Sequence, residues 1–351
     1  MIFFPIKSIM YQYPIQGEKK GKENAIIPMG QGLQGKKMSL EVRNLVKSYG
    51  NKVVLDHLSF EMKEPGVYAL LGTNGAGKTT SLRIILGMLS YDEGEVLWNE
   101  KPFKALSENV GYLAEERGLY PKYSLMDQLL YFAKLKNVSK SDAQKRIKYW
   151  AERLEVEEYL YPTVVKGKKT KLKNADQLSK GNQQKIQLMA ALISDPKLLV
   201  LDEPLSGLDP VNSDLFTSII REEMEKEKYL IMSSHQMSTI EQFCSNITIL
   251  NRGKTVLQGD LNQIKKEYGR VNMMLKCDQE IKPYLEKYEM KILNESPDGY
   301  QLKVPSQDQA AALLAKLIED KITVVRYELR EPSLHEIFVE KVGGVNDEER
   351  A

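Results

Sequence analysis

The sequence predicts an α/β protein with a mixed sheet, followed by a small α+β unit at the carboxyl end. Three observations carry this prediction. An apolar run at residues 67–71 leads into a glycine-rich loop and then into apolar residues at helical spacing. A second apolar run at 198–201 ends in two adjacent acids. Beyond about residue 266, strand and helix patterns alternate in the order βαββαβα, which is typical of a ferredoxin-like fold.

The loop after the first apolar run has the pattern GxxxxGK[ST] of a phosphate-binding loop. Glycines let the backbone wrap a phosphate closely, and the N–H groups at the start of the following helix add positive potential. We expect Lys78 to place its ammonium near the β- and γ-phosphates, and the Thr79 hydroxyl to ligate Mg²⁺. The predicted phosphate contacts are Gly72, Thr73, Asn74, Gly75, Ala76, Gly77, Lys78, Thr79 and Thr80.

Two acids, Asp202 and Glu203, follow the second apolar run, at the end of a strand where open α/β sheets bind their ligands. We expect Asp202 to hold Mg²⁺, directly or through water, and Glu203 to orient and deprotonate an attacking water. The next strand pattern, 229–235, ends in His235. This side chain could hydrogen-bond a γ-phosphate, although a lone histidine is usually structural.

Other segments complete the expected domain. Residues 40–60 alternate apolar and polar positions, which predicts antiparallel strands, and Tyr49 lies between them. This aromatic ring could stack on adenine or could be an ordinary loop residue. Residues 125–177 are predicted to be mostly helical, with aromatic side chains in the core, and the basic run 166–173 is predicted to be a solvated loop.

Composition excludes several classes of protein. No apolar run approaches the roughly 18 residues that a membrane-spanning helix needs. Cys244 and Cys277 form no disulfide framework or metal spacing and fit a reducing cytosol. The net charge is +2, but residues 1–38 hold six lysines and two glutamates, a net of +4, which leaves −2 for the rest. Charge therefore gives no case for a nucleic-acid partner.

Residues 1–37 differ in composition from the rest of the chain. The segment from Gln16 to Lys37 is rich in Gly, Lys and Gln, has no periodicity and is expected to be disordered. We expect translation to start at Met38, because residues 34–37 can be encoded by a purine-rich run that resembles a ribosome-binding site. Peptides from before Met38 in the native protein would contradict this.

The motifs taken together resemble the nucleotide-binding subunit of an ABC transporter, across roughly residues 39–265. The most specific of them is 178–182, Leu-Ser-Lys-Gly-Asn, about twenty residues before the acidic pair. This motif and the stretch 111–120 look most like bacterial exporters of the sodium-efflux and drug-resistance groups. In those exporters the ATPase and the membrane permease are separate chains, with the ATPase bound at the cytoplasmic face of the membrane.

The resemblance implies roles for matching residues. Tyr49 would stack on the adenine of ATP, and Glu115 would meet Mg²⁺ or water. Ser179 and Gly181 would touch the γ-phosphate of ATP bound to a second ATPase subunit, so that two ATP molecules are held in a head-to-tail dimer. Asp209 would help to form that interface.

Two positions depart from the family pattern. Glu115 stands where the family usually has glutamine, and a carboxylate cannot donate a hydrogen bond as an amide does, so we expect altered coupling. Lys180 and Asn182 replace a glycine and a glutamine of the usual LSGGQ motif. Lys180 could add positive charge near the phosphate or point to solvent.

We therefore expect three segments: an extension at 1–37, an ABC ATPase domain at 38–265 and an accessory domain at 266–351. The accessory domain could only stabilise the dimer, or it could bind the permease or regulate the ATPase. One alternative function is a non-transport ABC ATPase in translation or DNA repair, and another is a nucleotide-binding regulator that does not hydrolyse ATP. Glu203 and His235 argue against the latter.

Overall fold

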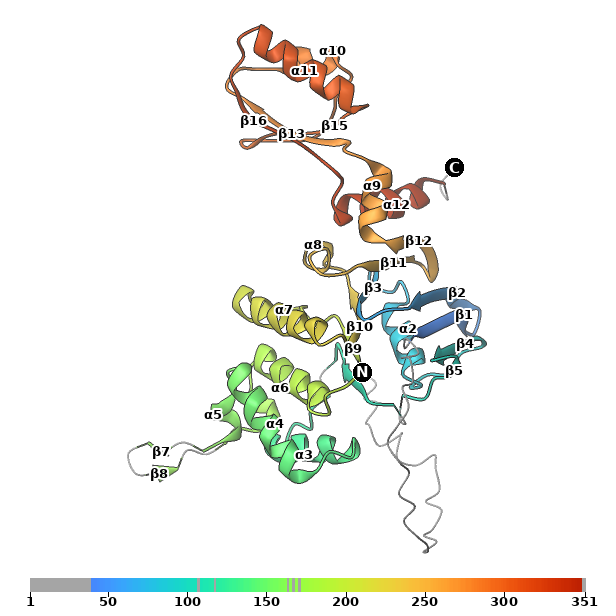
Figure 1. The fold of residues 1–351 in the computed structure, drawn as a ribbon, viewed down its shortest axis with the longest axis vertical. Helices are drawn as coiled ribbons and strands as arrows, with labels where there is room; N and C mark the ends of the chain where they lie inside the picture. Colours follow the sequence, from blue (N-terminus) through green and yellow to red (C-terminus); the bar gives the residue numbers. More distant parts are fainter. Residues whose placement is uncertain are drawn as a thin grey trace, which may run out of the picture. The chain divides into compact units, whose positions relative to one another are not determined.

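A computed structural model describes residues 39–105, 108–116, 118–162, 164–165, 168–169 and 172–348. The extension 1–37, the expected start at Met38 and four residues of the basic run 166–173 lie outside the described residues. No helix in the described part of the chain is long and apolar enough to span a bilayer. Figure 1 shows the order of the elements along the chain.

The first strands form an antiparallel sheet, as the alternation at 40–60 predicts. Its order is β2-β1-β4-β5, with β1 (Leu40–Tyr49), β2 (Lys52–Met62), β4 (Glu93–Trp98) and β5 (Lys101–Pro102). Strand β1 pairs with β2 and with β4, and its buried side chains, including Leu40, Val42 and Leu45, join the core beneath the sheet. Tyr49 ends β1 beside the turn into β2.

The second sheet carries the site. Its order is β12-β11-β3-β10-β9-β6, with β3 (Gly66–Gly72), β6 (Val110–Leu113), β9 (Leu198–Asp202), β10 (Tyr229–Ser234), β11 (Asn246–Asn251) and β12 (Lys254–Asp260). Strands β11, β3, β10, β9 and β6 are parallel, and β12 is antiparallel to β11. The carboxyl ends of β3, β9 and β10 therefore meet at one edge of the sheet, which brings residues 72, 202 and 234 together.

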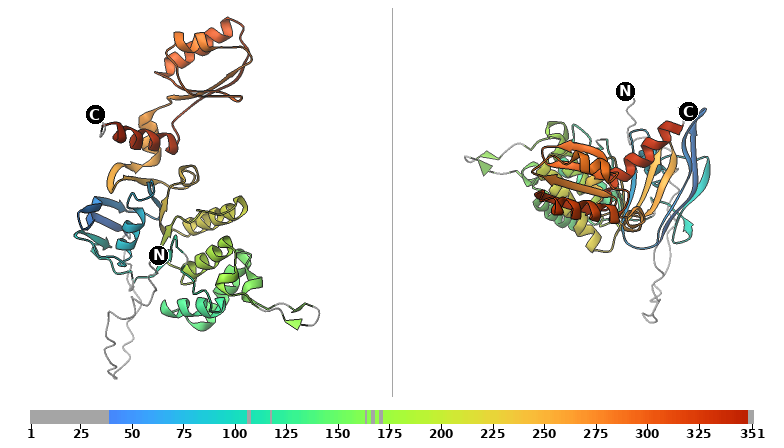
Figure 2. Two further views of the ribbon diagram at one scale, coloured as in Figure 1. Left: turned by 180° about the vertical axis from the view of Figure 1, so that it is seen from behind. Right: turned by 90° about the horizontal axis from the view of Figure 1, so that it is seen from above.

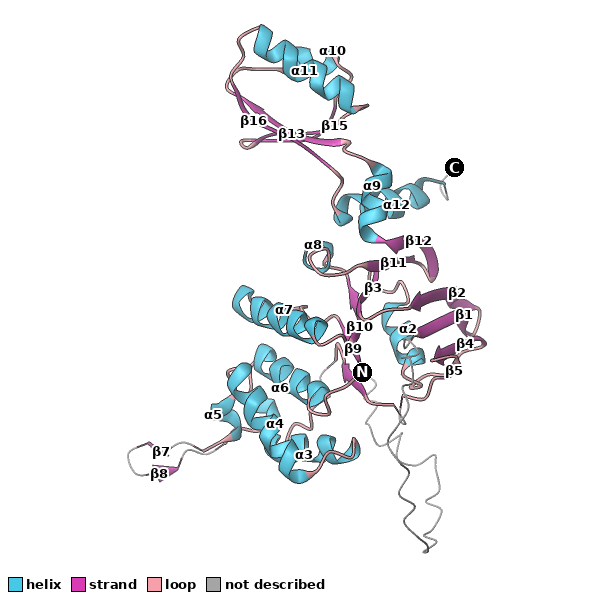
Figure 3. Cartoon of the chain, viewed as in Figure 1, coloured by secondary structure: helices cyan, strands magenta, loops and turns pink. Residues whose placement is uncertain are grey.

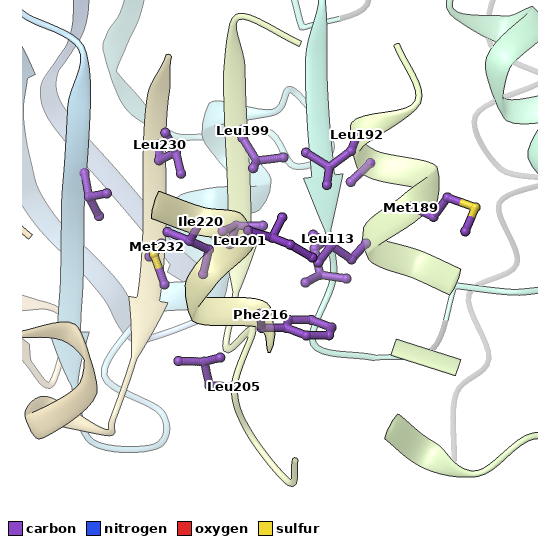
Figure 4. Packing of buried hydrophobic residues seen from close by; sticks show 14 of the residues in the cluster. Leu113, Met189, Leu192, Leu199, Leu201, Leu205, Phe216, Ile220, Leu230 and Met232 are labelled. Carbon is purple, nitrogen blue, oxygen red and sulfur yellow. The ribbon is translucent and has the colours of Figure 1, made fainter. Parts of the chain in front are cut away.

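Both faces of this sheet are buried, which explains the continuous apolar runs in its strands. On one face the core includes side chains of helices α6 (Lys180–Leu192) and α7 (Pro210–Glu225). Figure 4 shows Phe216 and Ile220 from α7 and Met189 and Leu192 from α6 near Leu199 and Leu201 of β9. The other face includes Leu82 and Ile85 of α2 (Lys78–Ile85).

The helical region is shorter than the sequence predicts. It contains α3 (Leu125–Leu135), α4 (Lys140–Arg153), α5 (Glu157–Leu160) and the 3-10 turn η1 (Ala175–Gln177). Two short strands, β7 (Val164–Val165) and β8 (Lys168–Lys169), pair within the segment that was expected to be helix and loop. The expectation that its aromatic residues are core is right for Trp150 but wrong for Tyr131, which is 38% exposed. Helical spacing does not reveal which face of a helix has a neighbour.

The carboxyl-terminal unit has the first six elements of the predicted βαββαβα order, and α12 (Leu334–Glu348) follows them in the place of the predicted last helix. Its elements are β13 (Asn272–Cys277), α10 (Lys282–Lys287), β14 (Lys291–Ser296), β15 (Gly299–Lys303), α11 (Gln307–Glu319) and β16 (Val324–Arg330). The sheet order β14-β15-β13-β16, with every pair antiparallel, is the ferredoxin-like arrangement. Helices α10 and α11 cover one face of the sheet (Figures 2 and 3) and bury Leu285, Leu313 and Leu317.

Three further helices belong neither to the helical region 125–177 nor to the ferredoxin-like unit 272–330. They are α8 (Met237–Ile240), α9 (Leu261–Tyr268) and α12 (Leu334–Glu348). The Glu241 carboxylate, directly after α8, accepts a hydrogen bond from the backbone N–H of Leu334 and pairs with Lys265 of α9. The proposed domain boundary at residue 265 falls within α9, and the three-segment division stays a prediction.

Candidate nucleotide-binding site

The glycine-rich loop lies between the end of β3 and the start of α2, and its backbone needs glycine. Gly77 has φ 108°, and a Cβ added there would lie 2.8 Å from the carbonyl oxygen of Val54. The Lys78 ammonium lies behind the loop, where it donates hydrogen bonds to the carbonyl oxygens of Gly72 at 3.0 Å and Thr73 at 3.3 Å. The Lys78 ammonium and the N-terminus of α2 therefore lie together at the loop, and both favour a bound anion such as phosphate.

Asp202 meets the loop at the carboxyl end of β9. The Thr79 hydroxyl donates a hydrogen bond to Asp202 Oδ1 at 3.1 Å, and the Ser233 hydroxyl donates to the same oxygen at 2.5 Å. The second oxygen, Oδ2, is buried and has no hydrogen-bond partner among the described residues. Burial raises the pKa of Asp202 despite the hydrogen bonds from Ser233 and Thr79, which lower it.

This donor set fits Mg²⁺. Mg²⁺ at a nucleotide site takes one or two protein oxygens and completes its shell with phosphate and water. The Thr79 hydroxyl and the unpartnered Asp202 oxygen supply such ligands. No group of three or more His, Cys, Asp or Glu side chains in the described ranges is arranged to hold a metal without a nucleotide. The ion would thus depend on the nucleotide for most of its ligands.

Glu203 connects three strand ends. One carboxylate oxygen, Oε1, lies 3.3 Å from the Lys78 ammonium, and the other, Oε2, lies 2.8 Å from Nδ1 of His235. The backbone N–H of Glu203 donates to the Ser233 hydroxyl at 3.0 Å. Glu203 is only 5% exposed and has φ 50°, an uncommon conformation for a residue other than glycine. Strain of this kind is frequently found at functional sites.

Of these residues, Lys78, Thr79 and Glu203 line a pocket of about 660 Å³, and Asp202, Ser233 and His235 lie outside its lining. Its walls are Tyr49, Lys52, Val53, Val54, Asn74, Gly75, Ala76, Gly77, Lys78, Thr79, Thr80, Glu115, Glu203 and Arg252. Tyr49 is 53% exposed, with the Lys47 ammonium 5.2 Å from its ring centroid, so one face of an exposed aromatic ring forms part of the wall. The volume lies in the range of small-molecule sites.

Glu115 also lines the pocket, from the loop that follows β6. Burial raises the pKa of Glu115, and the neighbouring carboxylates of Asp202 and Glu203 raise it further. Three acids thus converge near one lysine. A cation bound beside these carboxylates would favour their charged forms.

Ser179, Gly181 and Asp209 do not line this pocket. Ser179 caps helix α6 by accepting a hydrogen bond from the Asn182 N–H at 3.3 Å, as its sequence predicts. Asp209 caps α7 in the same way, and hydrogen bonds from Asn212 lower the pKa of Asp209. The Asn212 amide, bonded to Asp209, would lie 3.4 Å from a Cβ on Gly181. The three residues thus form a second cluster at two helix starts.

Several pocket and support residues were not singled out by the sequence analysis. Ser233 bonds to both Asp202 and Glu203, and its place near the end of a buried strand could have indicated this role. Lys52, the first residue of β2, and Arg252, in the turn between β11 and β12, also line the pocket. Asn212, between Asp209 and Gly181, gave no local signal in the sequence.

Comparisons with known proteins agree with this geometry. The family described as "ABC transporter" matches residues 55–206, and the family described as "ATP-binding protein DrrA1-3-like, C-terminal domain" matches 259–342. The ABC transporter ATP-binding protein YhaQ of Bacillus subtilis is 40% identical over 308 residues, which cover 87% of this chain and 99% of YhaQ. The bacitracin transport ATP-binding protein BcrA of Bacillus licheniformis is 28% identical over 87% of this chain and 97% of BcrA.

A solved structure shares the fold. The structure described as "ATP binding subunit of ABC transporter" aligns with a TM-score of 0.58 and 26% identity, over 66% of this chain and 93% of the other. The family match at residues 55–206 includes the loop 72–80 and the pair 202–203.

Proposed function

This chain belongs to the ABC transporter ATP-binding proteins, and from that premise we propose that it is the motor subunit of an exporter whose permease is a separate chain. The enzyme activity is ATP hydrolysis, and the cofactors are ATP and Mg²⁺, as in the family as a whole. The observation that carries the residue assignments is the position of Glu203 between Lys78 and His235 in the nucleotide-sized pocket.

We assign the ATP contacts to the loop 72–80 and the adenine contact to Tyr49, because Tyr49 and residues 74–80 of the loop line one pocket. Thr79 and Asp202 would hold Mg²⁺, which would supply positive charge to the phosphates. Glu203 accepts a proton from the attacking water, and Lys78 neutralises charge on the β- and γ-phosphate oxygens. Glu115, which also lines the pocket, would hold a water or Mg²⁺.

His235 positions Glu203. Its Nδ1 lies 2.8 Å from the Glu203 carboxylate, and we assign the other ring nitrogen, Nε2, to a γ-phosphate oxygen. Both partners are acceptors, so in this role both ring nitrogens carry a proton and donate. In this role His235 aligns the base and the reacting phosphate at the same time. The His235 side chain is 43% exposed, which leaves room for it to adjust when ATP binds.

Hydrolysis is completed between two copies. Ser179, Gly181 and Asp209 lie outside the pocket that holds Lys78, and they gather at the starts of α6 and α7. We propose that Ser179 and Gly181 contact the γ-phosphate bound by the other subunit, and that Asp209 supports this contact through Asn212. Two ATP molecules then close the dimer, and hydrolysis releases it.

The family members work with a membrane permease, and the described part of this chain has no helix that could span a bilayer. We therefore propose a peripheral position at the cytoplasmic face of the membrane, bound to a multispanning permease. Dimer closure would drive the permease through its transport cycle.

The cargo is proposed to be a drug-sized solute or sodium ion. The name of BcrA assigns that relative to bacitracin transport, which supports the drug-sized solute. Sodium rests on the resemblance of 111–120 and 178–182 to sodium-efflux ATPases. The alternative, an ABC ATPase in translation or repair, is less favoured because relatives over nearly their full length carry transporter names.

The test is purification of the tagged chain from detergent-solubilised native membranes. The proposal expects a protein with several membrane spans to copurify at a fixed ratio and to be lost when the membranes are omitted. Cells lacking the chain are then loaded with sodium or with bacitracin, and accumulation of one of the two identifies the cargo class. Ribosomes or DNA-repair proteins in place of a membrane partner would support the alternative.

A further inference from the structure

One wall of the pocket comes from the turn between β11 and β12, which no motif marks. Asn251 pairs with Lys254, so Arg252 and Gly253 form a two-residue turn, with φ 49° and 84°. Positive φ at both positions is the requirement of a type I′ hairpin turn, for which Asn-Gly is the preferred sequence. Arginine at the first position is disfavoured by the backbone. Its presence there calls for a role of the side chain.

The turn is fixed to the nucleotide-binding loop and to β2. The Gly253 N–H donates to the carbonyl oxygen of Ala76 at 3.1 Å, and the Asp56 N–H donates to the Gly253 carbonyl oxygen at 3.0 Å. A Cβ on Gly253 would lie 2.6 Å from the Val54 carbonyl oxygen, so the backbones are in close contact. Arg252 therefore has a defined position relative to Ala76 and Val54, and it lines the pocket.

The attachment points place Arg252 toward the adenine end of the pocket. Glu203, Lys78 and Thr79 mark the end that holds the γ-phosphate and Mg²⁺. Tyr49 and the start of β2, residues 52–54, mark the end assigned to adenine. Since the turn bonds to Asp56 of β2 and to Ala76 of the loop, its arginine belongs to the pocket wall between these two ends.

We propose that Arg252 binds the ribose–α-phosphate part of the nucleotide, with its guanidinium as a donor to the α-phosphate. This inference rests on the proposed nucleotide site. ATP and ADP share the α-phosphate, so the contact contributes equally to both and to the transition state. Arg252 is thus a binding residue that lowers KM without changing kcat.

The test uses Arg252→Asn, which suits the turn better than arginine and should leave the fold intact. The matched control is Lys254→Gln, which removes a positive charge two residues after Arg252. The Lys254 side chain is 72% exposed and does not line the pocket. Kd for MgATP and for MgADP, KM, kcat and the melting temperature are measured for the wild type and both variants.

The expected result is a rise of about 3- to 10-fold in KM and in both Kd values for Arg252→Asn, as one charge-assisted hydrogen bond would give. Its kcat should stay within about twofold, its melting temperature should not fall, and Lys254→Gln should match the wild type. Wild-type KM in Arg252→Asn would overturn the inference, as would a fall in kcat at constant KM. A wild-type chain that binds no MgATP would instead overturn the nucleotide site itself.

Discussion

The carboxylate of Glu203 lies 2.8 Å from Nδ1 of His235, and its other oxygen lies 3.3 Å from the ammonium of Lys78. Glu203, the proposed base, is therefore held between Lys78, which is assigned to the β- and γ-phosphates, and His235, which is assigned to the γ-phosphate. Since all three side chains come from different strand ends, parallel pairing of β3, β10 and β9 creates this relationship. A nucleotide that draws Lys78 onto its phosphates would release Oε1 of Glu203 for water.

Replacement of His235 by alanine should slow hydrolysis more than it weakens binding. The Nδ1 hydrogen bond that orients Glu203 is lost, so kcat should fall about 10- to 100-fold while Kd for MgATP changes little. Single-turnover hydrolysis and equilibrium titration measure the two effects. His335→Ala, an exposed histidine on α12, is the matched control and should behave as wild type. Equal rates for His235→Ala and the wild type would remove the positioning role.

Replacement of Lys78 by alanine should abolish nucleotide binding or turnover. The variant loses the cation that faces the phosphates and leaves the buried Glu203 carboxylate without its 3.3 Å ion pair. Titration with MgATP should show at least a 100-fold weaker Kd, roughly 2.7 kcal/mol. Lys63→Ala, at a side chain that is 75% exposed, controls for loss of charge. Unchanged affinity and rate would contradict the assignment of the loop.

The dimer proposal predicts that two inactive variants restore each other. The Cβ of Gly181→Asp would make ordinary contacts, 3.4 Å to Asn212 and 3.7 Å to Leu208, and an acid is favourable at a helix start. Its negative charge should nevertheless repel the γ-phosphate of the other copy. Mixing this variant with Lys78→Ala gives mixed dimers. In each mixed dimer, one site combines the intact loop of the Gly181→Asp subunit with the intact Ser179–Gly181 turn of the Lys78→Ala subunit.

The ATPase rate of that mixture should exceed the sum of the two variants measured separately, and it should rise with protein concentration. Each variant alone should show almost no turnover, while Gly181→Asp should bind MgATP as the wild type does. A mixture that is no more active than its parts would show that Gly181 does not serve the site of another subunit.

Much of this site was predictable because its residues lie close together in sequence. The loop 72–80 and the pair 202–203 each follow one apolar run, and the ferredoxin-like order follows from the alternation beyond residue 270. Arg252 was not predictable, because only the pairing of β11 with β3 brings it beside Ala76. Likewise, helical spacing in 125–135 could not show that Leu135, 60% exposed, has no covering neighbour among the described residues.

The stability of the contacts at the start of the carboxyl-terminal helix α12 should fall at acid pH. Burial would raise the pKa of Glu336, but hydrogen bonds from Arg330 and Ser333 outweigh it and lower this pKa from 4.5 to about 2. Since the folded-state pKa is depressed, the stabilisation is present above about pH 4.5 and is lost as the pH falls toward 2.

Glu336→Gln should therefore melt below the wild type at pH 7, and the difference should shrink between pH 4.5 and 2. At a roughly 2–4 °C change per kcal/mol, calorimetry can resolve the loss of one such network. Glu340→Gln, whose partner Lys303 is 46% exposed, is the control and should change little. A difference in melting temperature that is independent of pH would contradict the role of the Glu336 charge.

The central claim is that Glu203 is the base for ATP hydrolysis, and single-turnover hydrolysis by Glu203→Gln tests it most directly. Glutamine keeps the size of the side chain but cannot accept the proton from water. The account predicts that this variant binds MgATP with the affinity of the wild type, hydrolyses it at least 100-fold more slowly, and accumulates as an ATP-bound dimer. Hydrolysis by Glu203→Gln at the wild-type rate would contradict it.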